Sequence, residues 1–214
     1  MRATRSVATG LLPSADTCGA SNPGSFALLS MSASSPRPLV AANPANPDVG
    51  GRLLGLAPVF DAGVRVLVLG SFPGVASLQA AQYYAHPRNA FWPVMTELLG
   101  EAGLPARPYA LRLQALLAHG VGLWDAVASC VRVGSLDAAI ESAAPSDLSD
   151  LLLRLPGLRA IGCNGALAFR EARAILGEPG LPLLKLPSTS PAHAGLGLAD
   201  KISAWRAALG PHLG

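Results

Sequence analysis

From Leu53 to the C-terminus, short apolar runs bounded by glycine or proline alternate with longer amphipathic stretches. The apolar runs have the length of strands, and VRVLVLG (residues 64–70) lacks the alternation of a strand that has one face in water. A strand loses that alternation when helices cover both faces of a parallel sheet. We therefore predict an α/β fold, a three-layer α/β/α sandwich around a small, mostly parallel sheet.

The same pattern predicts the individual elements. Strands are predicted at residues 64–70, 121–127, 158–163 and 181–187. Helices are predicted at residues 90–99, 109–120, 146–155, 166–176 and 198–209. Ser146 is expected to cap the third of these helices. Ligands of parallel sheets bind at the carboxyl ends of strands, which directs attention to the turns after Leu69, Cys163 and Leu186.

Residues 1–51 differ from the rest of the chain, because they are rich in Ser, Pro, Ala, Gly and Asn and show no periodicity. We interpret them as a disordered extension before a single domain at residues 52–214. Of the net charge of +3, four arginines against two aspartates place +2 within residues 1–52. The domain itself is close to neutral, so bulk charge does not argue for nucleic-acid binding.

The three cysteines, Cys18, Cys130 and Cys163, are widely spaced and form no CxxC pair. This spacing fits neither a disulfide framework nor a zinc or iron–sulfur site. We expect free thiols in a reducing, cytoplasmic compartment, with no metal and no other cofactor. No apolar run approaches the ~20 residues of a membrane span, so no membrane partner is expected.

The loop GSFPG (Gly70–Gly74) directly follows the first predicted strand. Its two glycines and its proline let the backbone turn sharply and approach a ligand closely. The same residues also suit a simple turn between a strand and a helix. The loop lacks the GK[ST] ending of a Walker loop and the GxGxxG pattern, so it does not predict a phosphate cradle.

The segment QYYAHPRNAFW (Gln82–Trp92) holds four of the eleven Phe, Trp and Tyr residues of the chain. Asn89 precedes a helical pattern, which is typical of a helix N-cap. Its amide can also donate to and accept from a water, and so orient a nucleophile. These two roles compete for one side-chain oxygen and are treated as alternatives. Tyr84, beside a strand end, is a candidate platform on which a planar ligand stacks.

The segment LPSTSPAHAG (Leu186–Gly195) follows the last predicted strand. Its hydroxyls and backbone N–H groups are typical contacts of nucleic-acid phosphates. A capped turn into the last helix is the alternative interpretation. Taken together, the three loops predict an aromatic platform, a water-positioning amide and a phosphate-binding loop at one edge of the sheet.

Four segments in order also carry a family resemblance: VLVLGSFPG, QYYAHPRNAFW, GLWDAVASCVRVGSLDAAI and LPSTSPAHA. Together, over residues 52–205, they resemble the deoxyinosine (hypoxanthine) DNA glycosylase branch of the uracil-DNA glycosylase superfamily. The resemblance implies an α/β/α sandwich that hydrolyses the N-glycosidic bond of a deaminated base flipped out of single- or double-stranded DNA, in base excision repair. It implies hypoxanthine as the chief substrate, with uracil as a second one.

The resemblance also assigns residues to roles. The catalytic, water-holding asparagine is expected at Asn89, because Ser71 and Phe72 occupy the positions where other relatives carry an amide or carboxylate. The base-binding residues implied are Gly70, Ser71, Phe72, Tyr84 and Asn164. The resemblance implies that the loop STSPAHA clamps phosphates and wedges the duplex. The DNA contacts implied are Ser188, Ser190, Pro191 and His193, where His193 replaces a usual asparagine.

Only two lysines occur, Lys185 and Lys201, and neither lies in a motif as a Schiff-base nucleophile would. We therefore predict a monofunctional glycosylase without lyase activity, acting as a monomer. Three alternatives stay open. The enzyme prefers uracil, or the chain binds damaged DNA without cutting it, or it is a small-nucleotide enzyme that shares only the α/β layout.

Overall fold

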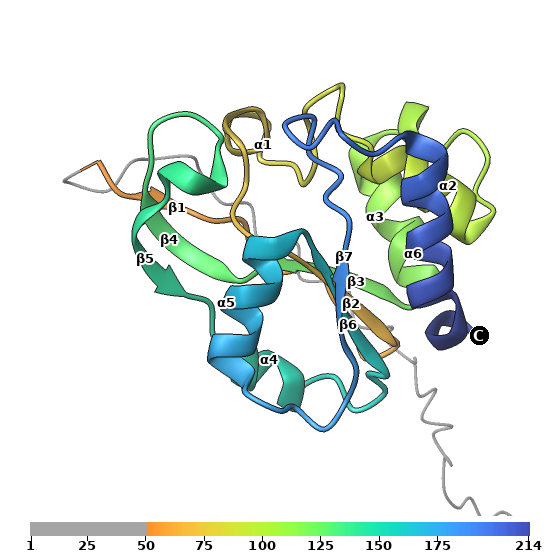
Figure 1. The fold of residues 1–214 in the computed structure, drawn as a ribbon. Coiled ribbons are helices and arrows are strands. Elements are labelled where there is room, and N and C mark those ends of the chain that lie inside the picture. The colour runs from red at the N-terminus through yellow and green to blue at the C-terminus, as the bar shows by residue number, and fades with distance from the viewer. Residues whose placement is uncertain (1–50) are drawn as a thin grey trace, which may run out of the picture. The chain divides into compact units, whose positions relative to one another are not determined.

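The computed structural model describes residues 51–214, which form two β-sheets with flanking helices (Figure 1). Except for Gly51, the predicted extension lies outside the described residues, as does Cys18. The larger sheet is parallel and has the strand order β3-β2-β6-β7. Its strands are β2 (Val66–Gly70), β3 (Val121–Asp125), β6 (Ala160–Asn164) and β7 (Leu183–Leu186).

Helices cover both faces of this sheet (Figure 1). One face carries α2 (Phe91–Leu99), α3 (Tyr109–Ala118) and α6 (Leu198–Leu213), and the other carries α4 (Leu148–Leu153) and α5 (Ala166–Leu176). The predicted three-layer α/β/α sandwich is therefore confirmed. The remaining helical segments are α1 (Val75–Ala80) and the short 3₁₀ turns η1 (Leu104–Ala106) and η2 (Asp137–Ala139). None of the helices within residues 51–214 is long and apolar enough to cross a membrane.

Strand β2 shows why its sequence lacks alternation. Val66 and Val68 pack into one hydrophobic cluster with α2, α3 and α6. Leu67 and Leu69 point the other way, into a cluster with α4 and α5. All four side chains are fully buried, so both faces of the strand are core.

The smaller sheet was not predicted. It is antiparallel, in the order β1-β4-β5, with β1 (Leu53–Leu54), β4 (Val127–Val131) and β5 (Glu141–Pro145). The strand predicted at residues 121–127 is present as β3, but it ends at Asp125, because the run divides at Ala126. There the N–H groups of Ala126 and Val127 donate to the carbonyls of Gly70 and Ser71, so the chain follows the turn after β2 into the second sheet.

The predicted cap of α4 is also wrong by one residue. Asp147 caps this helix, and its Oδ1 accepts a hydrogen bond of 3.0 Å from the N–H of Asp150. Ser146 is instead buried at the end of β5, where its N–H donates to the carbonyl of Ala126. Its place in the sheet connection keeps the serine hydroxyl away from the helix end.

Leu209 provides a test of the packing between α6 and the sheet. It is fully buried, and its side chain lies against Gly162 of β6, where an added Cβ would be 3.0 Å from Leu209 Cδ2. We expect Leu209→Ala to lower the free energy of unfolding by about 2–5 kcal/mol, through lost burial and a cavity. Urea unfolding of both proteins measures this. Leu153→Ala, at an exposed position of α4, is the control and should cost almost nothing; equal costs would contradict this packing.

Candidate active site

The four parallel strands bring their carboxyl ends to one edge of the sheet. They end at Gly70, Asp125, Asn164 and Leu186. The loops that follow β2 and β7, with α1, lie together at the top of the view (Figure 1). The predicted convergence of the loops after β2, β6 and β7 at one edge is thus present in the fold.

Gly70 is the point of closest approach at this edge. A Cβ added to Gly70 would lie 2.2 Å from Asp125 Oδ1 and 3.6 Å from the Tyr84 hydroxyl oxygen. No side chain larger than hydrogen fits there without moving the carboxylate. The structure therefore brings together two predicted base-binding residues, Gly70 and Tyr84, with a carboxylate between β2 and its neighbouring strand.

The rest of the GSFPG loop is held by contacts to the segment after β4. Ser71 Oγ donates to Asp137 Oδ1 at 2.7 Å. The Phe72 ring is buried in a small cluster with Val127 and Cys130, and the guanidinium of Arg132 lies 4.9 Å from its centroid. The side chain of Phe72 thus belongs to the second sheet's core. Neither the Ser71 N–H nor the Phe72 N–H donates to another described residue.

Asp125 was missed in the sequence analysis. It ends β3, is 4% exposed, and its Oδ2 is buried without a hydrogen-bond partner among the described residues. Burial raises the pKa of this carboxyl to about 7, against the opposing effect of Arg132 and with a further contribution from Asp137. An aspartate closing an apolar run, as in VGLWDAV, is a signal that could have identified it.

Tyr84 has an unusual backbone for a bulky residue, with φ of +55°. Its ring stacks on Phe91, with centroids 3.8 Å apart and 18° between the planes. Its hydroxyl is buried, and no described residue meets it with hydrogen-bond geometry. Burial and the nearby Asp125 raise the pKa of this hydroxyl, which the Asn164 amide partly offsets. Strained backbone with an unpaired polar group is common at ligand sites.

Asn89 lies just before α2, and its Oδ1 accepts a hydrogen bond of 2.9 Å from the Phe91 N–H. Ala90 is the N-cap residue of α2, and no side chain caps this helix, so the predicted N-cap role of Asn89 is wrong. The bond to Phe91 closes a turn just before the helix instead. An amide oxygen has two lone pairs, and the Asn89 Nδ2 donates to no other described residue. The water-positioning role of Asn89 stays a prediction.

Thr189, in the loop after β7, joins that loop to the end of β6 and to the segment before α2. Its N–H donates to Asn164 Oδ1 at 2.9 Å, while its Oγ1 accepts from Asn164 Nδ2 at 2.8 Å. Its carbonyl accepts from the Ala90 N–H at 2.9 Å, next to Asn89. The residue is 1% exposed. Both ends of the Asn164 amide are engaged in this junction, which leaves it one N–H and one lone pair for a base.

The loop after β7 is stiffened from within and from α6. Ser188 Oγ accepts from the Ser190 N–H at 3.2 Å. Trp205 Nε1 donates to the Pro187 carbonyl at 2.9 Å, and the buried Lys201 donates through Nζ to the His193 carbonyl at 3.0 Å. Ser188, Ser190 and Pro191 are half-buried, whereas residues 192–195 are exposed at the tip.

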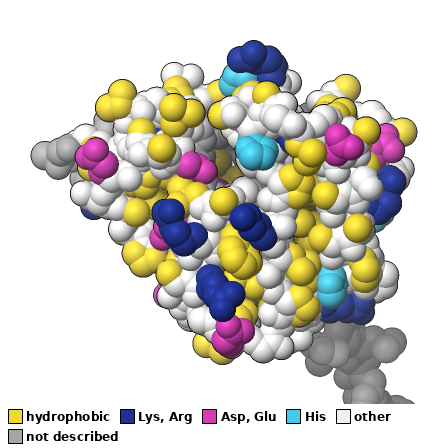
Figure 2. All heavy atoms as spheres, in the orientation of Figure 1, with side chains coloured by type: hydrophobic (Ala, Val, Ile, Leu, Met, Phe, Trp, Pro, Cys, Tyr) yellow, Lys and Arg dark blue, Asp and Glu magenta, His cyan; other side chains and the backbone are white. Residues whose placement is uncertain are grey.

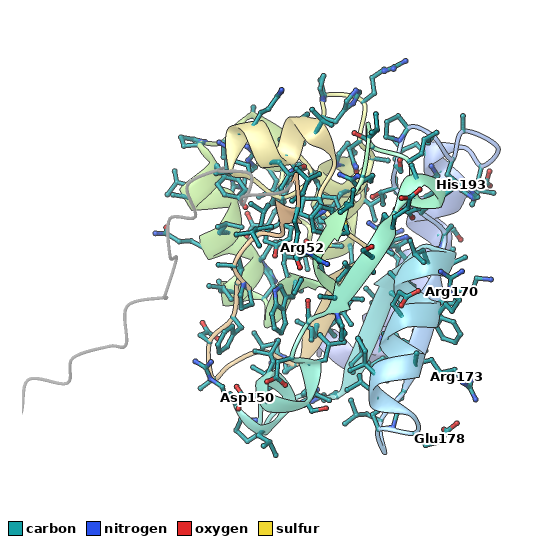
Figure 3. All side chains as sticks on the ribbon, turned by 90° about the vertical axis from the view of Figure 1, so that its left-hand side faces the viewer. Arg52, Asp150, Arg170, Arg173, Glu178 and His193 are labelled. Carbon is teal, nitrogen blue, oxygen red and sulfur yellow. The ribbon has the colours of Figure 1, made fainter. Side chains whose placement is uncertain are left out.

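Figure 3 shows His193 at the opposite end of the molecule from Glu178. Its ring is thus exposed at the carboxyl edge of the sheet, the same edge as Gly70 and Asp125. Within residues 51–214 there is no group of three or more His, Cys, Asp or Glu side chains that could hold a metal ion.

The Thr189 junction predicts a difference between two substitutions. Thr189→Val leaves the N–H of Asn164 buried without its acceptor, which costs about 1–3 kcal/mol of stability. Thr189→Ser keeps the hydroxyl and is the matched control. Urea unfolding of the three proteins should rank wild type and Thr189→Ser together, well above Thr189→Val. If the valine variant were as stable as the serine variant, the hydroxyl would not be part of the junction.

Comparisons with known proteins confirm the family resemblance, since a model described as the uracil DNA glycosylase superfamily matches residues 57–208. A hypoxanthine DNA glycosylase of Methanosarcina barkeri is 37% identical over 111 residues, which are 52% of this chain and 70% of that protein. A hypoxanthine DNA glycosylase of Methanosarcina acetivorans is 35% identical over 139 residues, 65% of this chain and 87% of that protein. The solution NMR structure of a protein from M. acetivorans, provisionally named a uracil DNA glycosylase, superimposes with a TM-score of 0.64 and 31% identity, covering 73% of this chain and 98% of that one. The chain therefore belongs to the uracil DNA glycosylase superfamily.

Proposed function

We propose that this chain is a DNA glycosylase that hydrolyses the N-glycosidic bond of deaminated bases, chiefly hypoxanthine. The proposal rests on the group formed by Gly70, Tyr84 and the buried carboxyl of Asp125, in a chain whose two curated relatives are named hypoxanthine DNA glycosylases. The substrate is DNA, and the deaminated base is extruded from the stack to reach the sheet edge.

Asp125 is the candidate for reading the base. A neutral carboxyl donates through its O–H and accepts through its C=O. Hypoxanthine offers the matching pair, an O6 acceptor beside an N1–H donor. As the glycosidic bond breaks, negative charge spreads onto O6, and the hydrogen bond from Asp125 strengthens. Adenine has no carbonyl there, so it gains less in the transition state.

The N–H groups of Ser71 and Phe72 are candidates for stabilising the departing base. Donors of this kind, aimed at developing charge, typically contribute about 3–4 kcal/mol each. The ring of Phe72 is turned away from this position, so its share in base binding is assigned to its backbone. The Tyr84 ring, already supported on one face by Phe91, is the candidate stacking surface.

Asn89 is assigned to the attacking water. Its oxygen accepts one hydrogen bond, from the Phe91 N–H, which orients the amide. A second lone pair and both amide N–H groups remain for the water. An amide is a poor base, which suits a reaction whose oxocarbenium-like transition state needs a placed water more than a proton acceptor. Ser188, Ser190, Pro191 and His193 are assigned to phosphates, with Lys201 holding their loop.

Asn89→Ala is the decisive variant. We expect single-turnover release of hypoxanthine from a deoxyinosine duplex, read by alkali cleavage of the strand, to fall by at least about 10²-fold. Asn89→Asp keeps an oxygen both for the Phe91 N–H and for the water, so it should retain more activity than Asn89→Ala at equal stability. Cleavage by the alanine variant at the wild-type rate would limit Asn89 to the turn before α2. Strand nicking without alkali would contradict the monofunctional mechanism.

The protonation state of Asp125 predicts the pH dependence. Its pKa of about 7 means that the carboxyl is neutral below that pH and charged above it. The charged form repels O6 and the leaving base, so the single-turnover rate should fall by about tenfold per pH unit above the pKa. Asp125→Asn keeps an N–H donor that does not titrate and should give a flat profile between about pH 6 and 9. A wild-type profile as flat as that of the asparagine variant would remove Asp125 from base recognition.

Uracil is a second candidate substrate, and the buried carboxyl of Asp125 favours it as well. Its O4 and N3–H present the same acceptor and donor as hypoxanthine to a neutral carboxyl at Asp125. Running deoxyuridine duplexes beside deoxyinosine duplexes ranks the two bases. Binding of a lesion duplex without base release would favour the damage-binding alternative.

A further inference from the structure

The loop between β4 and η2, residues 132–136, supports the GSFPG loop through Arg132, but its exposed side chains have no role in the site described above. Among residues 51–214, eight large hydrophobic side chains are exposed. Five of them lie on this segment or on the elements beside it: Leu54, Val75, Val131, Val133 and Leu136. Figure 2 shows hydrophobic side chains on the lobe at the upper left, where the β4–η2 loop and α1 lie in Figure 1. Apolar side chains gathered in this way mark a contact surface.

The two most exposed of these side chains are on the loop itself. Val133 is 90% exposed and Leu136 is 59% exposed. Both residues therefore offer apolar groups to whatever approaches the carboxyl edge of the sheet, and neither contributes to a core.

Four contacts fix this loop and the start of η2 to the GSFPG loop and to the first residue of α1. Arg132 Nη2 donates to the Pro73 carbonyl, and its guanidinium covers the Phe72 ring. Ser135 Oγ accepts from the Val75 N–H at 2.9 Å. Asp137 accepts from Ser71. The exposed pair is thus held rigidly beside the loop that lines the candidate base site.

The loop after β7, which the family resemblance assigns both to phosphates and to wedging the duplex, lacks large apolar groups at its tip. Its exposed residues, 192–195, are two alanines, His193 and a glycine. It can contact phosphates, but apart from the His193 ring it has no large side chain to fill the space that an extruded base leaves. The β4–η2 loop, on the other side of the GSFPG loop, has such groups.

Building on the proposed function, we propose that Val133 and Leu136 form an apolar wedge that enters the duplex next to the extruded nucleotide. Proteins that unstack DNA commonly insert side chains of this kind between base steps. The phosphate contacts and the wedge would then lie on two different loops, on either side of the base site. The partner is duplex DNA, because single-stranded DNA has no base stack for the wedge to fill.

The test uses the full chain and the double variant Val133→Ser/Leu136→Ser. Both positions are exposed, so these changes remove no core packing. Leu153→Ser, at a leucine of α4 that is 84% exposed, is the matched control. The probe is an oligonucleotide with 2-aminopurine next to deoxyinosine, used as a duplex and as a single strand. The 2-aminopurine fluoresces more strongly when it is unstacked.

We expect the double variant to bind the duplex about tenfold more weakly and to lose most of the fluorescence rise. Binding to the single strand should stay unchanged, as should both readouts for Leu153→Ser.

Other results overturn the proposal. Wild-type affinity and fluorescence in the double variant would show that the loop does not enter the duplex. Loss of the fluorescence rise in His193→Ala, with its retention in the double variant, would place the wedge on the loop after β7. In sedimentation velocity, wild type could sediment as a dimer and the double variant as a monomer. That result would make the surface a self-association site.

The fluorescence readout needs no base release. If wild type unstacks the probe but releases no hypoxanthine, the glycosylase function fails while the wedge stands.

Discussion

The end of strand β2 is the reference point for every other part of the site. The strand is paired on both sides and buried on both faces, so the position of Gly70 is fixed by the core. The Asp125 carboxylate occupies the space where a side chain on Gly70 would be, and the Tyr84 hydroxyl adjoins it. A carboxyl confined in this way is cut off from water, which is why its pKa rises to about 7. The proposed recognition of the base depends on this one close approach.

The Thr189 junction fixes the positions of segments that belong to other elements. Asn164 ends β6, Ala90 directly precedes α2, and Thr189 lies in the loop after β7, yet three hydrogen bonds join these residues at the buried Thr189. The proposed water-holding Asn89 and the proposed phosphate-binding serines are therefore positioned relative to the sheet by the same residue. Catalytic groups held from several directions need little rearrangement when the substrate binds.

The small antiparallel sheet has a different part in the architecture. It packs Phe72, Val127 and Cys130 beneath the GSFPG loop, and Arg132 covers the ring. The side chain of Phe72 is thereby held in the core of the small sheet, while the Ser71 and Phe72 N–H groups donate to no other described residue. The loop that follows β4 in this sheet carries the exposed Val133 and Leu136.

The sequence alone determined the layers of the fold, the parallel strands and the order of the helices, because periodicity and strand length depend only on which faces are buried. It also determined that the loops after β2, β6 and β7 share an edge, and the family motifs led to Asn89, Tyr84 and the serines. The division of residues 121–131 between two sheets depended on tertiary structure, since it follows from hydrogen bonds to the carbonyls of Gly70 and Ser71. The cap at Asp147, the inward turn of Phe72 and the engagement of Asn164 by Thr189 depended on it for the same reason. The altered pKa of Asp125 could not be read from the chain either, because burial and neighbouring charges come from residues far apart in sequence.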